Sequence, residues 1–221
     1  MVMGYLRDRE VVVRYAGGEF RKETSKGCIQ GSIAGQTFRN LVLDSLLREL
    51  EDFGVYVQAF VDDVVLMFSG QSASTLEAET NRALAHVKDW GDRNKFRFEP
   101  LKTNGMVLTK KIKFDVPIIR MGNTEIVLVD EIRLLGLTID NRLTFMPHVA
   151  KACKKAANIY KDIARAAKAT KGLSPEIVTT IYVAVMEPIV MYASCAWAPA
   201  ARKLGIRKIL DTLQRSIALK V

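Results

Sequence analysis

The sequence predicts an α+β protein, with an antiparallel sheet and packed helices in residues 1–140 and a mainly helical part in residues 141–221. Residues 1–140 alternate short β-rich runs with two segments of helical apolar spacing, and from Pro147 onward the spacing is helical throughout. The charge follows a similar division: residues 1–110 hold 15 basic and 15 acidic side chains, whereas residues 111–221 hold 18 and 9. A neutral half is therefore joined to a half that carries the whole net charge of +9.

The composition excludes several classes of protein. A chain of 221 residues with 49% hydrophobic and 26% charged residues is an ordinary globular mixture, so disordered and low-complexity proteins are excluded. The basic balance favours a polyanionic partner, either nucleic acid or an anionic membrane surface. The few, scattered cysteines argue for a reducing compartment and against a disulfide framework or a zinc cluster: Cys28, Cys153 and Cys195. The first nine residues lack the apolar core of a signal peptide, so secretion is not indicated.

The first elements are a hairpin and a helix. Residues 11–15 and 19–21 are β-rich and flank Gly17-Gly18, which predicts a β-hairpin. A glycine-punctuated loop over residues 26–32 leads into a helix expected over residues 36–52 and ended by Gly54. We expect the apolar face of this helix to consist of Phe38, Leu41, Val42, Ser45, Leu46 and Leu50.

A second hairpin is predicted from two apolar, β-branched runs over residues 55–61 and 64–68, with Asp62 and Asp63 at its tip. Because both runs are apolar on both faces, we expect the hairpin to be covered on both sides. A capping box, Ser74-x-x-Glu77, predicts a following helix that continues to about Trp90 and stops at Gly91.

The next region predicts only short strands. They are expected over residues 96–98 and 106–109, followed by a pair over residues 125–129 and 132–139 that is joined by Asp130-Glu131.

The basic half begins with an amphipathic helix over residues 149–171. On a helical wheel its cations fall within one arc, and Ala152, Ala156, Ile159, Tyr160 and Ile163 face the other way. Ser174 and Pro175 predict the start of the next helix. The cations on the polar arc are Lys151, Lys154, Lys155, Lys161, Arg165 and Lys168.

Residues 177–199, a stretch of 23 residues with one charge, are long enough to span a membrane. Glu187-Pro188 lies at its centre, and a mid-bilayer glutamate beside a helix-breaking proline would cost several kcal/mol without a partner. Two buried helices that meet at Pro188 are the better interpretation, so no membrane partner is expected.

Asp62-Asp63 is the most unusual local feature. Adjacent carboxylates at a covered tip repel each other and lose hydration unless a cation compensates them, and hard oxygen ligands suit Mg²⁺. On composition alone the other interpretation is favoured, since aspartate is a good turn residue that points to water. Taken singly, Gln30-Gly31-Ser32, Lys102 and Leu135-Gly136-Leu137 are weaker signals still.

The order of these features raises their weight. Together they resemble the consecutive palm and thumb motifs of non-LTR (LINE-type) retrotransposon reverse transcriptases, closest to the insect type-1 clade that inserts into ribosomal DNA. The segments that carry the resemblance are residues 25–32 (SKGCIQGS), 58–66 (QAFVDDVVL), 90–95 with 102–103, 132–139 (IRLLGLTI), 147–149 and 192–197 (YASCAW).

The resemblance implies residue roles. Asp62 and Asp63 would belong to the carboxylates that hold two Mg²⁺ (or Mn²⁺) ions about 4 Å apart, and Lys102 would be the general acid for the pyrophosphate leaving group. Leu135, Gly136 and Leu137 would form the primer grip. The cations of the basic helix would follow duplex phosphates with little sequence preference. Phe60 would pack near the primer end, and the residues beside the template and the incoming nucleotide would be Gln30, Gly31 and Ser32.

The resemblance also implies partners: an RNA template, a DNA primer and dNTPs, inside the cell and in the nucleus when DNA is the target. Departures from the family pattern matter here. The third metal-binding Asp and the fingers should precede this chain, so we expect little polymerase activity from the chain alone. Gln36 and Arg39 stand where the family tends to have proline and a large apolar residue, and a buried arginine would be costly.

Two alternatives stay open. The chain could be a non-catalytic nucleic-acid-binding remnant that acts through its basic helix alone. It could also be a degenerate, element-derived open reading frame. A splicing-type maturase is a more distant alternative within the polymerase class.

Overall fold

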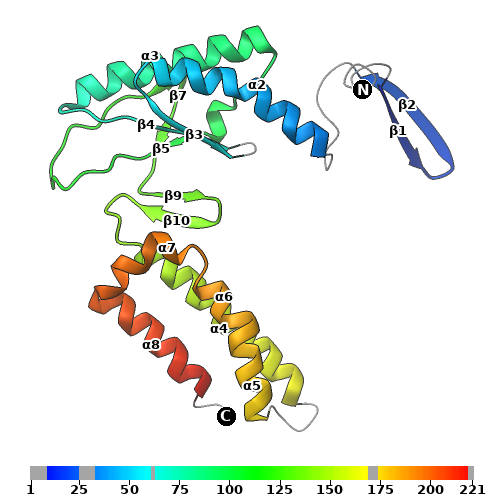
Figure 1. Cartoon of the computed structure of the whole chain (residues 1–221), viewed down its shortest axis with the longest axis vertical. Coiled ribbons are helices and arrows are strands. Elements are labelled where there is room, and N and C mark those ends of the chain that lie inside the picture. The colour runs from blue at the N-terminus through cyan, green and yellow to red at the C-terminus, as the bar shows by residue number, and fades with distance from the viewer. Residues whose placement is uncertain (1–8, 25–32, 61–62, 169–173, 219–221) are drawn as a thin grey trace. The chain divides into compact units, whose positions relative to one another are not determined.

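The computed structural model describes residues 9–24, 33–60, 63–168 and 174–218 (Figure 1). Its mixture of helices and strands confirms the α+β class. The chain divides into two compact units, Met1–Phe98 and Glu99–Val221. This division falls before the predicted boundary at 140/141 because the last strand pair packs on the helix that follows it. The separation of palm from thumb at 140/141 stays a prediction.

The first hairpin is confirmed, with β1 (Arg9–Tyr15) antiparallel to β2 (Gly18–Thr24). The turn is Ala16-Gly17, because Gly18 already pairs with Tyr15. One face carries the ion pairs of Arg14 with Glu19 and of Arg21 with Glu10 and Glu19. The other face carries the exposed side chains of Val11, Val13, Tyr15 and Phe20.

The core of the first unit lies between α2 (Ile33–Asp52) and α3 (Ala73–Asn94), which lie side by side in Figure 1. Trp90 of α3 is 1% exposed, and its indole Nε1 donates to Ser45 Oγ of α2 at 3.1 Å. At the polar edge of the pair, Glu49 of α2 accepts from Arg93 of α3 at 3.2 Å. Apolar contact and hydrogen bonds therefore join the two helices.

The predicted core face of α2 is wrong in part. Leu46 and Leu50 are fully buried as expected, but Leu41 is 66% exposed, Val42 is also exposed, and Leu43 is buried instead. The helix is apolar on more than one side, so spacing alone does not determine which leucines are buried.

The ends of α3 also differ from the prediction. The N-cap is Ser72, whose Oγ accepts from Thr75 N, and not Ser74. The helix continues past Gly91 to Asn94 and is ended by Lys95 in the left-handed conformation at φ 59°. Gly91 does not stop the helix; it allows close packing, since a Cβ there would lie 2.9 Å from the Phe96 carbonyl oxygen.

The second hairpin is confirmed as β3 (Tyr56–Phe60) antiparallel to β4 (Asp63–Met67). The expectation that both faces are covered is wrong for the described residues. Val57 is buried and Leu66 is half-buried on the face toward the helices, but Tyr56, Phe60 and Met67 on the other face are exposed.

The strands of the second unit are short. Residues 106–109 do not form the predicted strand. Residues 96–98, at the end of the first unit, are not a strand either, and Phe96 and Phe98 pack on the Trp90 ring with ring centroids 5.4 and 6.3 Å from it. The pair expected over residues 125–129 and 132–139 is also wrong, since residues 131–140 form a hairpin of their own. The strands are β5 (Asn104–Gly105), parallel to β8 (Val127–Leu128); β6 (Arg120–Met121), antiparallel to β7 (Thr124–Glu125); and β9 (Glu131–Leu134), antiparallel to β10 (Leu137–Asp140).

Helices build the rest of the second unit (Figure 1). They are α4 (Met146–Lys168), α5 (Pro175–Ile181), a π-helical turn (Tyr182–Met186), α6 (Glu187–Val190), α7 (Ser194–Trp197), a 3₁₀ turn (Ala198–Arg202) and α8 (Leu204–Ala218). Ser174 caps α5 as predicted, its Oγ accepting from Ile177 N. The core joins α4 to every later helix through Cys153, Ala156, Tyr160, Val178, Met186, Val190, Trp197, Ile206 and Leu213.

The prediction that two helices meet at Pro188 is wrong. The path is helical from Pro175 to Val190, with the π-turn before the proline, and it breaks at Met191–Ala193, where Ala193 is left-handed at φ 53°. No single helix of the described part is long and apolar enough to cross a membrane. The bent pair Pro175–Val190 and Ser194–Arg202, at 61°, meets that test by length and composition.

The leucines of α2 provide a test of its observed core face. Leu46→Ala should destabilise the chain by about 2–5 kcal/mol, because a fully buried leucine leaves a cavity, whereas Leu41→Ala should change the free energy of unfolding by less than about 0.5 kcal/mol. Urea denaturation followed by circular dichroism measures both. Equal losses from the two variants would contradict the observed packing.

Candidate functional site

The tip of the second hairpin presents Asp63 and Phe60 together. Asp63 begins β4 and is the direct cross-strand partner of Phe60, the last residue of β3, so the two side chains share one face. Both side chains are exposed, Phe60 by 60%. Asp62 lies outside the described residues. An exposed carboxylate beside an exposed aromatic ring offers oxygen ligands to a hard cation and a stacking surface to a base or sugar.

The Asp63 carboxylate has no hydrogen-bond or ion-pair partner among the described residues. Within that part of the chain, no group of three His, Cys, Asp or Glu side chains could hold a metal ion. Among the described residues, the Asp63 carboxylate therefore stands by itself as a candidate ligand.

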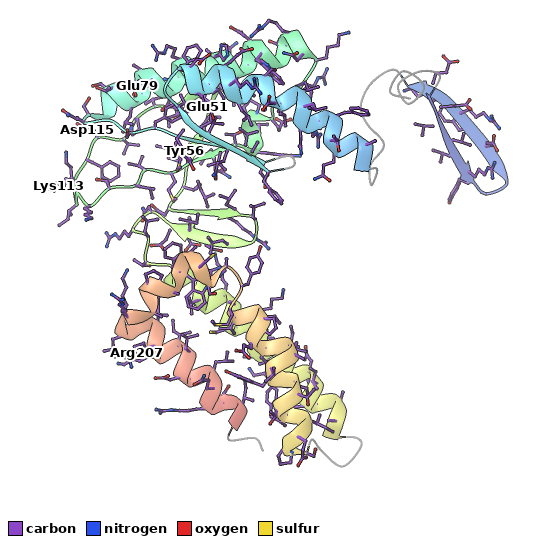
Figure 2. All side chains as sticks on the ribbon, viewed as in Figure 1. Glu51, Tyr56, Glu79, Lys113, Asp115 and Arg207 are labelled. Atoms are coloured by element: carbon purple, nitrogen blue, oxygen red, sulfur yellow. The ribbon has the colours of Figure 1, made fainter. Side chains whose placement is uncertain are left out.

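A hollow of 410 Å³ in the same unit lies away from this tip. It is lined by Tyr56 and Met67 at the opposite end of the hairpin and by Glu79 and Arg82 of α3. Figure 2 marks Tyr56 and Glu79. The hollow is separate from the acidic tip, and we assign it no role in the chemistry.

The other residues predicted around the reaction are placed only in part. Gln30, Gly31 and Ser32 lie outside the described residues. Lys102 ends a 3₁₀ turn (Pro100–Lys102) in the second unit, where its side chain is exposed. An exposed ammonium group is free to approach a phosphate, as the general-acid role requires.

Leu135, Gly136 and Leu137 do not form a continuous strand. Leu135 and Gly136 are the two-residue turn of the β9–β10 hairpin, with φ of 48° and 86°, and Leu137 begins β10. Two successive positive φ values are typical of a type I′ hairpin turn. The Leu135-Gly136 part of the segment predicted as a primer-grip strand is therefore a hairpin turn.

The cationic face of α4 is present as predicted. Lys151, Lys154, Lys155, Lys161 and Arg165 are exposed, opposite the buried Ala152, Ala156 and Tyr160. Lys151 pairs with Glu131 at 2.6 Å, and Arg165 pairs with Asp162 at 3.2 Å. Lys154, Lys155 and Lys161 form no ion pair with any described residue, so three ammonium groups stay available for phosphates. Lys168, the sixth predicted cation, is the last residue of α4, and its side chain is not among the described ones.

A second cationic face lies on α8, and the sequence reasoning missed it. Arg207, Lys208 and Arg215 are exposed outside the buried face of Ile206, Leu213 and Ile217. Figure 2 marks Arg207 on this helix. Among the described residues none of these three cations has an ion-pair partner. The same helical-wheel argument that found the face of α4 would have found this one.

The unusual residues of α2 are harmless to packing. Gln36 and Arg39 are both exposed, so no charge is buried there. Arg39 therefore does not indicate a damaged fold.

Comparison with known proteins identifies the family. The model of the reverse transcriptase (RNA-dependent DNA polymerase) family matches residues 3–139. The chain belongs to the reverse transcriptase family. Members of this family act on a nucleic-acid template, a primer and nucleotides, with divalent metal ions.

Similar proteins come from insect retrotransposable elements. The chain is 27% identical over 215 residues to a 115 kDa protein of the type-1 element R1DM of Drosophila melanogaster, covering 97% of this chain and 21% of that protein. It is 26% identical over 216 residues to the Pol polyprotein of the type-1 element R1 of Bradysia coprophila, covering 97% and 22%. The chain thus spans about a fifth of the length of these relatives. No solved structure matches it.

Asp140 positions the cationic helix. It is buried at the end of β10, where its carboxylate accepts from Thr144 N at 3.0 Å and from Phe145 N at 2.7 Å, immediately before α4. Burial by itself raises the pKa of Asp140, but the hydrogen bonds from Thr144 and Phe145 outweigh it and hold the pKa below its ordinary value of 3.8.

This pKa gives a test. A lowered pKa in the folded state stabilises the fold above about pH 4, and the contribution is lost as the pH falls through the folded-state pKa. Asp140→Asn should therefore lower the free energy of unfolding by about 1–3 kcal/mol at pH 7, and the loss should shrink below pH 4. Urea titrations across that pH range measure it. The control is Asp115→Asn in an exposed loop (Figure 2); a loss independent of pH, or equal in the control, would contradict the assignment.

Proposed function

We propose that this chain is the palm and thumb part of an RNA-directed DNA polymerase from a non-LTR retrotransposon. In this role it extends a DNA primer on an RNA template from dNTPs, as part of a longer protein. The observation that carries the proposal is the family match over residues 3–139, which contains Asp62, Asp63 and Lys102. The cationic helix α4 follows directly after it.

The metal chemistry is assigned to Asp62 and Asp63, with Mg²⁺ as the expected ion. The exposed carboxylate of Asp63, which has no partner among the described residues, is a hard oxygen donor that fits Mg²⁺ or Mn²⁺. When bound, the metal supplies charge stabilisation to the attacking and leaving oxygens of nucleotidyl transfer. Lys102 would donate a proton to the departing pyrophosphate.

The remaining roles concern the partners. Phe60 would pack against the primer end, and Gln30, Gly31 and Ser32 would lie beside the template and nucleotide. The cations of α4 would contact duplex phosphates, which implies binding with little sequence preference and strong salt dependence. We expect the whole protein to act in the nucleus.

A second candidate function is duplex binding without catalysis. It is favoured by the exposed cations of α4 and α8, several of which have no ion-pair partner among the described residues and need no metal site to act. The two candidates differ in metal binding at the acidic tip, and the experiments below separate them.

Duplex binding tests the cationic face. The triple variant Lys154→Glu, Lys155→Glu and Lys161→Glu should weaken binding of an RNA–DNA duplex on the order of 100-fold at 0.1 M salt. It should also reduce the salt slope of log K by about 3, since each lysine that contacts a phosphate contributes about one unit. Fluorescence anisotropy over a salt series measures both.

The matched control reverses three lysines of the exposed loop in the same unit: Lys110→Glu, Lys111→Glu and Lys113→Glu. This control changes the net charge equally. If it weakened binding as much as the α4 variant, the attraction would be to net charge and the helical face would carry no special role.

Metal binding tests the acidic tip. The wild-type chain should enhance the water-proton relaxation of Mn²⁺, and the double variant Asp62→Asn with Asp63→Asn should bind the ion about tenfold more weakly. The control, Asp89→Asn with Asp92→Asn, removes two exposed acids of α3. If the control lost as much, or the wild type bound no Mn²⁺, the tip would be a solvated turn and duplex binding alone would remain.

A further inference from the structure

We propose that Tyr192 and His148 are positioning residues that lock the turn Leu135-Gly136 onto the helical unit, at a fixed place relative to the cationic face of α4. The inference rests on the proposed function, in which this turn meets the primer.

The turn is strained without outside support. Leu135 has a φ of 48°, a region that costs a side chain with a Cβ about 1 kcal/mol or more, and leucine is not a residue that favours it. The Leu135 side chain is exposed, so burial of its own does not hold it there. Something beyond the hairpin must stabilise this conformation.

Tyr192 supplies that support from the break between α6 and α7. Its hydroxyl donates to the carbonyl oxygen of Leu135, 57 residues away in sequence. Its ring lies against Gly136, where an added Cβ would be 3.2 Å from Cε1 and 3.4 Å from the hydroxyl oxygen. Gly136 therefore serves twice, by allowing a φ of 86° and by leaving room for the ring.

His148 holds the base of the same hairpin. A two-residue turn makes Leu134 and Leu137 a hydrogen-bonded pair, so the Thr138 N–H points away from β9. That N–H donates to Nδ1 of His148 at 3.3 Å, in a buried environment. With Nδ1 as acceptor, the neutral ring carries its proton on Nε2, which lies 3.4 Å from the carbonyl oxygen of Tyr192.

The break in the helix makes the Tyr192 carbonyl available. The Ala196 N–H donates to Ala193 and not to Tyr192, because Ala193 is left-handed. The freed oxygen of Tyr192 accepts instead from Nε1 of the buried Trp197 at 2.9 Å and from His148. The backbone of Tyr192 is thus bonded to Trp197 and His148 in the helical part, while its side chain bonds to the turn.

These contacts make a continuous path from the turn to α4. His148 belongs to the first turns of α4, so the same ring that satisfies Thr138 fixes the hairpin to the helix. The turn and the lysines of α4 must then move as one body. For a primer strand held along α4, this sets where its end meets the hairpin.

The test compares Tyr192→Phe with the matched control Tyr182→Phe. The Phe variant keeps the ring against Gly136 and removes only the donor to Leu135. The control removes a tyrosine hydroxyl of the same unit, one that accepts from Gln214 at 3.3 Å. Amide hydrogen exchange of Leu134, Leu137 and Thr138 in the whole chain is the first readout. We expect about fivefold faster exchange in Tyr192→Phe and no change in the control. Unchanged exchange in Tyr192→Phe would overturn the lock.

The second readout is an RNA–DNA duplex with a fluorescent base at the DNA 3′ end. Tyr192→Phe should bind this duplex within about twofold of the wild type, because the α4 lysines are intact, but lose the fluorescence change of the terminal base at saturation. A retained fluorescence change together with faster exchange would overturn the positioning role. If the wild type bound no duplex, the proposed function would fail and the primer role with it, while the exchange data would still decide whether the lock exists.

Discussion

The helical half of the molecule depends on how the chain passes from β10 into α4. Asp140 and His148 stand on either side of this passage. His148 accepts from the Thr138 N–H, which strand pairing leaves unsatisfied, and Asp140 accepts from the N–H groups of Thr144 and Phe145 in the connection to α4. A buried N–H without a partner costs about 1–3 kcal/mol, so the two side chains determine the direction in which α4 leaves the hairpin. The position of α4 in turn determines where the later helices pack on its buried face and where the lysines on its outer face are presented.

The sequence predicts best those elements whose own residues determine them. The two faces of α4 follow from 23 residues with one strong period, and β3 and β4 follow from β-branched runs on either side of two acids. The core face of α2 could not be chosen, because leucines occur around the helix and only tertiary packing selects Leu43, Leu46 and Leu50. Similarly, residues 96–98 read as a strand but pack their rings on Trp90.

The candidate site shows the same limit. The acids, Lys102 and the cations of α4 could be named in advance, since each is a local signal strengthened by order along the chain. The turn at Leu135-Gly136 could not, because leucine does not favour a positive φ and the residue that supports it, Tyr192, is distant in sequence. A conformation imposed by a tertiary contact leaves no mark in a local pattern.

The distribution of charge has a physical reason in this arrangement. The exposed face of the β3–β4 hairpin carries Tyr56, Gln58, Phe60, Val65 and Met67 beside Asp63, and none of these neighbours is a cation. A lysine or arginine on that face would pair with the carboxylate and compete with a divalent ion for the same oxygens. Exposed cations are present instead on α4 and α8, whose buried sides belong to the core of the second unit. Metal binding and phosphate binding need opposite charges, and the chain provides them on separate elements.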